Sequence, residues 1–163
     1  MSLGLDIAMK SLENKENIKT KFMKAALKEA VKASLVNEIP VGCVIVKDGH
    51  IVARAHNKKE IKQDVVAHAE VIAIQKAEKK LNTWHLEDCD IYVTLEPCPM
   101  CSYAIILARI KNLYYGALDP KAGAHVSKIN LFDTKFNHIV HVEGNILEYE
   151  STKLLKEFFK KLR

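Results

Sequence analysis

Apolar residues recur every three or four positions over residues 22–35, which predicts an amphipathic helix from about Glu16 to Leu35. Its buried face is expected to hold Phe22, Met23, Ala26, Leu27, Ala30, Val31 and Leu35. Pro40 then stops any continuation of the helix. A run rich in β-branched residues over 41–46, an Asp-Gly pair at 48–49 and a return over 51–56 predict a β-hairpin.

The remaining pattern alternates strands with helices. Residues 57–64 are polar and predict a loop, and Asp64 can cap a helix that ends near Leu81. Further strands are expected over residues 90–95, 112–117 and 139–142, with helices over 97–109, 126–132 and 147–162. The last helix is expected to bury Leu154, Leu155, Phe158, Phe159 and Leu162. This order predicts an α/β protein whose sheet has parallel members and helices on both faces.

Length and composition fit one globular domain. The chain has 163 residues, 48% of them hydrophobic and 28% charged, with no repeat and no linker-like stretch. We expect residues 1–20 to be an N-terminal extension and residues 21–163 to form one domain. Whether residues 1–10 are native or a cloning remnant stays open. No membrane-spanning run or secretory signal is recognisable, which favours a cytoplasmic location.

Charge is concentrated at the end of the chain. The formal net charge is +5, and residues 151–163 contain five basic residues and one acidic residue. Positively charged side chains are favoured at the C-terminal end of a helix, so this stretch could simply be a solvated helix face. A contact with RNA is about equally supported.

The four cysteines divide into two kinds. Cys43 and Cys89 lie in or beside strand-like runs and are expected to be small buried hydrophobes. Cys98 and Cys101 form a Cys-x-x-Cys motif between two prolines, at the predicted start of a helix. Alone, such a pair could be a redox centre or half of a structural zinc site.

A second motif, His68-Ala69-Glu70, makes those alternatives less favourable. A redox pair needs no His-x-Glu, and a closed zinc site needs a fourth Cys or His. His68, Cys98 and Cys101 would instead give zinc three ligands and leave a fourth position open, as catalytic zinc requires. Glu70 stands two positions from a ligand, where a carboxylate can move protons between a metal-activated water and a substrate. This combination of motifs is typical of zinc nucleobase deaminases.

The chain resembles bacterial tRNA-specific adenosine deaminases of the TadA type, within the cytidine/deoxycytidylate deaminase superfamily. The resemblance covers about residues 22–163 and includes Glu38-Ile39-Pro40-Val41-Gly42, Ala55-His56-Asn57, Ala67-His68-Ala69-Glu70 and Tyr92-Val93-Thr94-Leu95-Glu96-Pro97-Cys98. It implies a three-layer α/β/α cytidine-deaminase-like fold with a five-stranded mixed sheet. It also implies a homodimer with one Zn²⁺ per subunit, and substrate contacts from Asn57 and Ala69.

The implied reaction is hydrolytic deamination of the wobble adenosine to inosine in a tRNA anticodon loop, with zinc-activated water and Glu70 as the proton shuttle. The alternatives are a guanine, cytosine or nucleotide deaminase on the same fold, a non-catalytic zinc-containing RNA-binding subunit, and a redox protein that uses Cys98 and Cys101. The metal motifs do not separate the first alternative from the RNA enzyme. A non-catalytic subunit would be expected to lack Glu70, and a redox protein would form a disulfide in place of a metal site.

Overall fold

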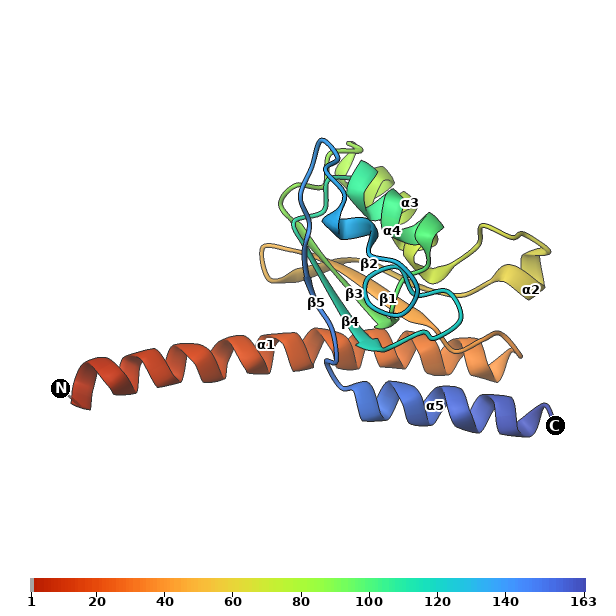
Figure 1. The fold of residues 1–163 in the computed structure, drawn as a ribbon, viewed down its shortest axis with the longest axis horizontal. Helices are drawn as coiled ribbons and strands as arrows, with labels where there is room; N and C mark the ends of the chain where they lie inside the picture. Colours follow the sequence, from red (N-terminus) through yellow and green to blue (C-terminus); the bar gives the residue numbers. More distant parts are fainter. Residues whose placement is uncertain (1) are drawn as a thin grey trace.

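A computed structural model describes residues 2–163, so Met1, the first residue of the expected N-terminal extension, lies outside the described residues. Figure 1 shows a sheet between two layers of helices. The helices are α1 (Ser2–Leu35), α2 (Lys59–Lys62), α3 (Ala69–Leu81), α4 (Pro99–Leu107), the 3₁₀ turn η1 (Leu131–Asp133) and α5 (Glu148–Lys161). The strands are β1 (Gly42–Lys47), β2 (His50–His56), β3 (Cys89–Leu95), β4 (Asn112–Ala117) and β5 (His141–Glu143).

The five strands form one mixed sheet in the order β2-β1-β3-β4-β5. Strand β1 runs antiparallel to β2 and β3, whereas β3, β4 and β5 are parallel. Helices α3 and α4 cover one face, and α1 and α5 lie on the other (Figure 1). The predicted three-layer α/β/α fold with a five-stranded mixed sheet is confirmed.

The alternation of side chains along the strands builds both cores. Cys43 and Ile45 of β1 pack in the cluster under α3 and α4, while Val44 and Val46 pack against α1. Cys43 and Cys89 are fully buried within this framework, as expected of small hydrophobic residues.

Helix α1 is much longer than the sequence pattern indicated, because it begins at Ser2 and not near Glu16. Residues 3–18 are all exposed, so no packing pattern marks this part. The assignment of the buried face was partly wrong: Val31 and Leu35 are 43% and 78% exposed. Gly42 lets α1 approach β1 closely, since a Cβ there would lie 1.9 Å from the carbonyl oxygen of Ala26.

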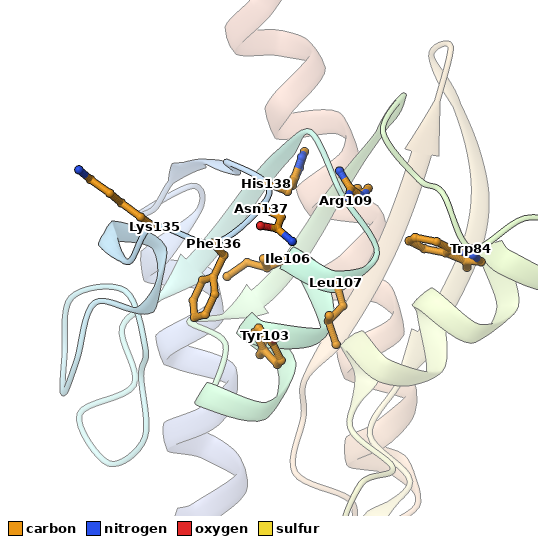
Figure 2. A pocket seen from close by; sticks show the side chains of 9 residues that line it. All are labelled: Trp84, Tyr103, Ile106, Leu107, Arg109, Lys135, Phe136, Asn137 and His138. Atoms are coloured by element: carbon orange, nitrogen blue, oxygen red, sulfur yellow. The ribbon is translucent and has the colours of Figure 1, made fainter.

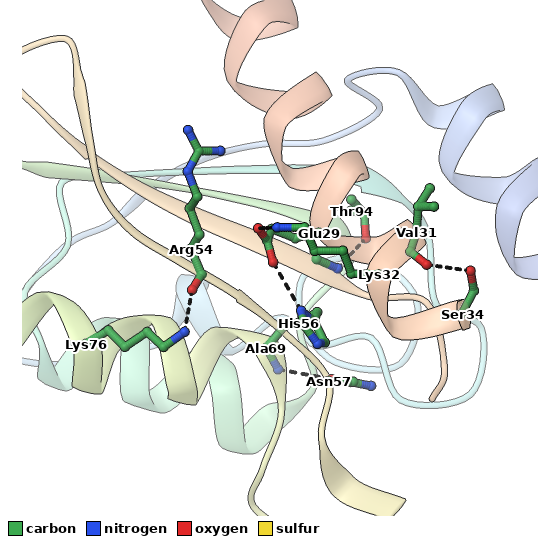
Figure 3. A network of polar contacts seen from close by, with 11 residues as sticks. Glu29, Val31, Lys32, Ser34, Arg54, His56, Asn57, Ala69, Lys76 and Thr94 are labelled. Carbon is green, nitrogen blue, oxygen red and sulfur yellow. Dashed lines mark hydrogen bonds and ion pairs between the residues drawn. The ribbon is translucent and has the colours of Figure 1, made fainter. Parts of the chain in front are cut away.

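A buried carboxylate joins α1 to β2. Glu29 is buried, and its carboxylate accepts hydrogen bonds from Lys32 at 2.8 Å and from His56 Nδ1 at 3.1 Å (Figure 3). Burial alone would raise the pKa of Glu29, but these two partners outweigh it and lower the pKa. The contacts with Lys32 and His56 explain why an acidic residue is tolerated on the sheet-facing side of α1, where its neighbours are apolar.

Four local predictions were wrong. Residues 57–64 contain the one-turn helix α2, and Asp64 accepts a hydrogen bond from the N–H of Val66 at 3.0 Å instead of capping α3. The helix expected over residues 126–132 is only the 3₁₀ turn η1. In α5, Phe159 and Leu162 are 40% and 64% exposed and not buried. The apolar period of this helix is too broad to distinguish its core side from its flank.

The hairpin turn has the expected geometry. Asp48 and Gly49 have φ of 50° and 75°, as the two-residue turn that joins twisted antiparallel strands requires. None of the helices within residues 2–163 combines the length and apolar character needed to cross a lipid bilayer.

Candidate active site

Three possible metal ligands meet where the sheet ends under two helix N-termini. His68 Nδ1 lies 3.7 Å from Cys98 Sγ and 3.5 Å from Cys101 Sγ, and all three ligand atoms lie within 4.8 Å of one another. Bonds of about 2.0–2.1 Å to nitrogen and about 2.3 Å to sulfur around a tetrahedral ion separate the two atoms by roughly 3.6 Å. The donor set and its spacing therefore fit a metal ion with one position left for another ligand.

Backbone geometry at the helix starts produces this convergence. His68 and Cys98 are the N-cap residues of α3 and α4, both with extended backbone, and Pro99 occupies the first turn of α4. Cys101 follows in the first turn of α4 and is fully buried. The positive end of a helix dipole stabilises thiolates, which are the form of cysteine that binds metal.

The pKa values of the two thiols are shifted in opposite directions. Hydrogen bonding from Cys101 and then from His68 outweighs burial and lowers the pKa of Cys98 to about 4. The pKa of Cys101 is raised by the same contact with the Cys98 thiolate and by burial. The hydrogen bond between His68 and Cys98 raises the pKa of His68.

Glu70 stands beside these ligands at the start of α3. The residue is 4% exposed, and burial raises the pKa of its carboxyl group. Glu70, His68 and Cys98 all line one pocket of about 190 Å³, so a bound molecule would meet the carboxyl group and the ligands together.

Asn57 and Ala69 are also brought to this site. The Ala69 N–H donates to Asn57 Oδ1 at 3.0 Å (Figure 3), which fixes the amide and leaves Nδ2 at the opposite end. Asn57 lines the pocket, whereas Ala69 is fully buried behind it. Substrate contact by either residue stays a prediction.

A second buried carboxylate, Glu96, shapes the pocket wall. It accepts hydrogen bonds from the backbone N–H groups of Asp119, His125, Val126 and Ser127, at 2.8–3.0 Å, and from the Ser127 hydroxyl. Burial opposes ionisation, but these five donors outweigh it and lower the pKa of Glu96 to about 2. The Glu96 carboxylate thus fixes the loop over residues 118–127. Part of this loop was expected to belong to a helix over residues 126–132.

Sequence reasoning gave Glu96 no role, although it precedes Pro97 and Cys98 directly. Lys59, Asp119 and Ala122 also line the pocket, and none of them was assigned a role in the site from the sequence. Gly123 is the sequence feature that could have indicated the role of Glu96. A Cβ at this position would lie 2.3 Å from the Glu96 carboxylate, so the loop packs over Glu96 only because residue 123 is glycine.

Fold and site together define the class. A mixed five-stranded sheet with a His/Cys/Cys group at two helix N-termini, and a buried glutamate beside it, is the arrangement of hydrolytic deaminases. The profile of the MafB19-like deaminase family matches residues 17–163.

Comparison with individual proteins narrows the class. The tRNA-specific adenosine deaminase of Aquifex aeolicus is 52% identical over 143 residues, which cover 87% of this chain and 94% of that protein. The Bacillus subtilis protein of the same name is 47% identical, over 87% and 89% of the two chains. A solved structure from work on A-to-I editing by tRNA:A34 deaminases at the wobble position superposes with a TM-score of 0.81 at 44% identity, covering 83% of this chain and 99% of that chain. This chain belongs to the tRNA-specific adenosine deaminases, which are hydrolases that act on a C–N bond.

Proposed function

We propose that the protein deaminates the wobble adenosine of a tRNA anticodon loop to inosine, with one Zn²⁺ per subunit held by His68, Cys98 and Cys101. The observation that carries this proposal is the pocket that Glu70, Asn57, His68 and Cys98 line together, in a chain similar to tRNA-specific adenosine deaminases and to a structure from work on tRNA:A34 deaminases. Zinc in such a site supplies a water of lowered pKa at neutral pH.

The chain's own residues then bind the base and move protons. Asn57, fixed by Ala69, offers its Nδ2 amide to an acceptor on the bound nucleoside. Glu70 takes a proton from the attacking water at its carboxylate and delivers it to N1 of adenine while the water oxygen bonds to C6. It then passes the second proton of that oxygen to the amino group, which leaves as ammonia when the C6–N6 bond breaks. The base has to leave its stack first, which costs least in an unpaired loop.

Helix α5 is suited to the neighbouring nucleotides. Its exposed Phe159 lies with Lys156, Lys160 and Arg163 in a hollow of about 300 Å³ that begins at Ala117 and Leu118, directly before the pocket residue Asp119. An aromatic ring among cations can stack on a base and attract its phosphates. Phe158 packs in the interior and has no such role.

We also propose that the enzyme is a homodimer and that residues 21–163 form its catalytic domain. Exposed apolar side chains gather on α4 around a hollow of about 270 Å³, where Tyr103, Leu107 and Trp84 are 42%, 56% and 53% exposed (Figure 2). An exposed apolar surface of this kind is typical of a protein–protein interface, here with a second copy of the chain. A cytoplasmic location follows from the substrate, because bacterial tRNA is found there.

The decisive experiment offers the purified protein free bases, nucleosides, nucleotides and an anticodon stem-loop RNA. We expect inosine in the RNA alone, read as guanosine on sequencing. Conversion of guanine, cytosine or a nucleotide with the RNA untouched would establish the small-molecule alternative. RNA binding without any conversion by zinc-loaded protein would establish the non-catalytic alternative.

A further inference from the structure

A basic groove lies between α1 and the edge strand β2, and it shares no lining residue with the catalytic pocket. Its volume is about 420 Å³, and none of the nine residues that line it is acidic. Four of them are cationic: Lys21, Lys24, Lys28 and Arg54. Asn17 and Thr20 add side chains that can donate hydrogen bonds.

The positive charge in this groove is not neutralised. Ion pairs elsewhere in residues 2–163 involve Lys19, Lys32 and Lys153, but none of the four groove cations. Lys76 adds a fifth charge nearby, because its Nζ donates to the carbonyl oxygen of Arg54 at 2.8 Å (Figure 3). The guanidinium of Arg54 extends away from that contact and stays available.

Spacing and position relate the groove to the active site. Lys21, Lys24 and Lys28 lie on one side of α1 and span roughly 10 Å at about 1.5 Å per residue. Arg54 stands three residues before Asn57, which corresponds to about 10 Å of strand. The groove therefore begins close to the catalytic pocket and leads away from it.

We propose that this groove binds the phosphate backbone of the paired RNA stem adjoining the loop whose base enters the pocket. The inference rests on the proposed RNA substrate. Paired RNA is recognised mainly through its shape, its phosphates and its 2′-hydroxyls, which lysine, arginine and the two neutral donors can contact. Helix α5 would hold nucleotides of the loop, and the α1–β2 groove would hold the stem.

The test compares two variants of equal charge change. Lys24→Glu/Lys28→Glu alters the groove, and Lys79→Glu/Lys80→Glu alters the remote end of α3. Binding of a stem-loop and of the same loop as an unpaired oligonucleotide is measured between about 50 and 200 mM salt. The groove variant should bind the stem-loop about tenfold more weakly, with a salt slope reduced by about 2, and bind the unpaired strand normally.

Equal stem-loop affinities and salt slopes in the two variants would overturn the proposal and leave the groove to an acidic protein partner. If the charge reversal unfolds the protein, Lys24→Ala/Lys28→Ala replaces it, with an expected loss of about threefold. Groove-dependent stem binding by an enzyme that deaminates no RNA would reject the proposed function but not the groove. Normal deamination without groove dependence would reject the groove alone.

Discussion

At the scale of single residues, the pocket combines potential metal ligands, an oriented amide and a buried carboxyl group. His68, Cys98 and Cys101 bring three potential metal-ligand atoms together, and Asn57 is oriented by a hydrogen bond from Ala69. Glu70 is buried beside the ligands without belonging to the group of three. These positions could be identified from the sequence, because a zinc site of the proposed kind requires these residue types at this spacing.

Replacement of Glu70 by glutamine should abolish turnover without removing the metal. The amide keeps the shape but cannot carry a proton, so kcat should fall by about 10²- to 10⁴-fold. The measurement is single-turnover deamination together with metal content. Glu78→Gln, on the same helix, is the control and should keep its activity. A zinc-loaded Glu70→Gln enzyme of normal rate would exclude the proton-transfer role.

Removal of a metal ligand, in contrast to Glu70→Gln, should lower the zinc content of the protein. His68→Ala or Cys98→Ala leaves two protein ligands, so the purified protein should contain much less than one zinc per chain by elemental analysis. Cys89→Ala, whose thiol is buried at the start of β3, should retain full zinc. Full occupancy in the His68 and Cys98 variants would show that the ion binds elsewhere.

Among the elements, the loop over residues 118–127 depends most on a single contact. Its backbone N–H groups converge on Glu96, and it contributes Asp119 and Ala122 to the pocket. These hydrogen bonds to one carboxylate hold a loop that has almost no regular secondary structure.

Gly123→Ala should loosen this loop. The new methyl group would overlap the Glu96 carboxylate, and overpacking of this kind costs about 1–3 kcal/mol. We expect Tm to fall by roughly 3–10 °C and KM for RNA to rise. Gly4→Ala, which meets nothing within 4 Å, is the control. Equal melting temperatures of the two variants would contradict the role given to Glu96.

The same loop shows where sequence patterns stop being informative. Strands β1 to β4 were predicted within a residue or so because their apolar runs face two helix layers. The supposed helix over 126–132 failed because its backbone donors bond to a carboxylate some thirty residues earlier, and no local pattern records that partner. Likewise, Val31 is exposed on the side of α1 that faces away from the sheet, although Ala30 and Ala33 next to it are buried, and Leu35 is exposed at the end of the helix.

The whole molecule is asymmetric, since α1 extends well beyond the sheet that supports its second half (Figure 1). Residues 3–18 bury nothing within the described chain and include exposed leucines at positions 3, 5 and 12. The fold therefore does not depend on them.

Deletion of residues 2–16 should leave the deaminase domain intact. We expect Tm to change by less than about 2 °C by differential scanning calorimetry, because no core contact is lost. Phe22→Ala, further along the same helix, removes a buried ring and should cost about 3–5 kcal/mol, or roughly 10 °C. A large drop on truncation would mean that this half of α1 stabilises the body.

The ends of the chain differ in what an attached label would disturb. Arg163 borders the hollow next to the pocket, whereas the other end of the chain is carried away on a 34-residue helix roughly 50 Å long. A fluorophore or affinity handle fused ahead of α1 would sit at the tip of this helix, about 20 Å beyond Asn17 at the outer end of the basic groove. The same handle placed behind α5 would compete with incoming RNA.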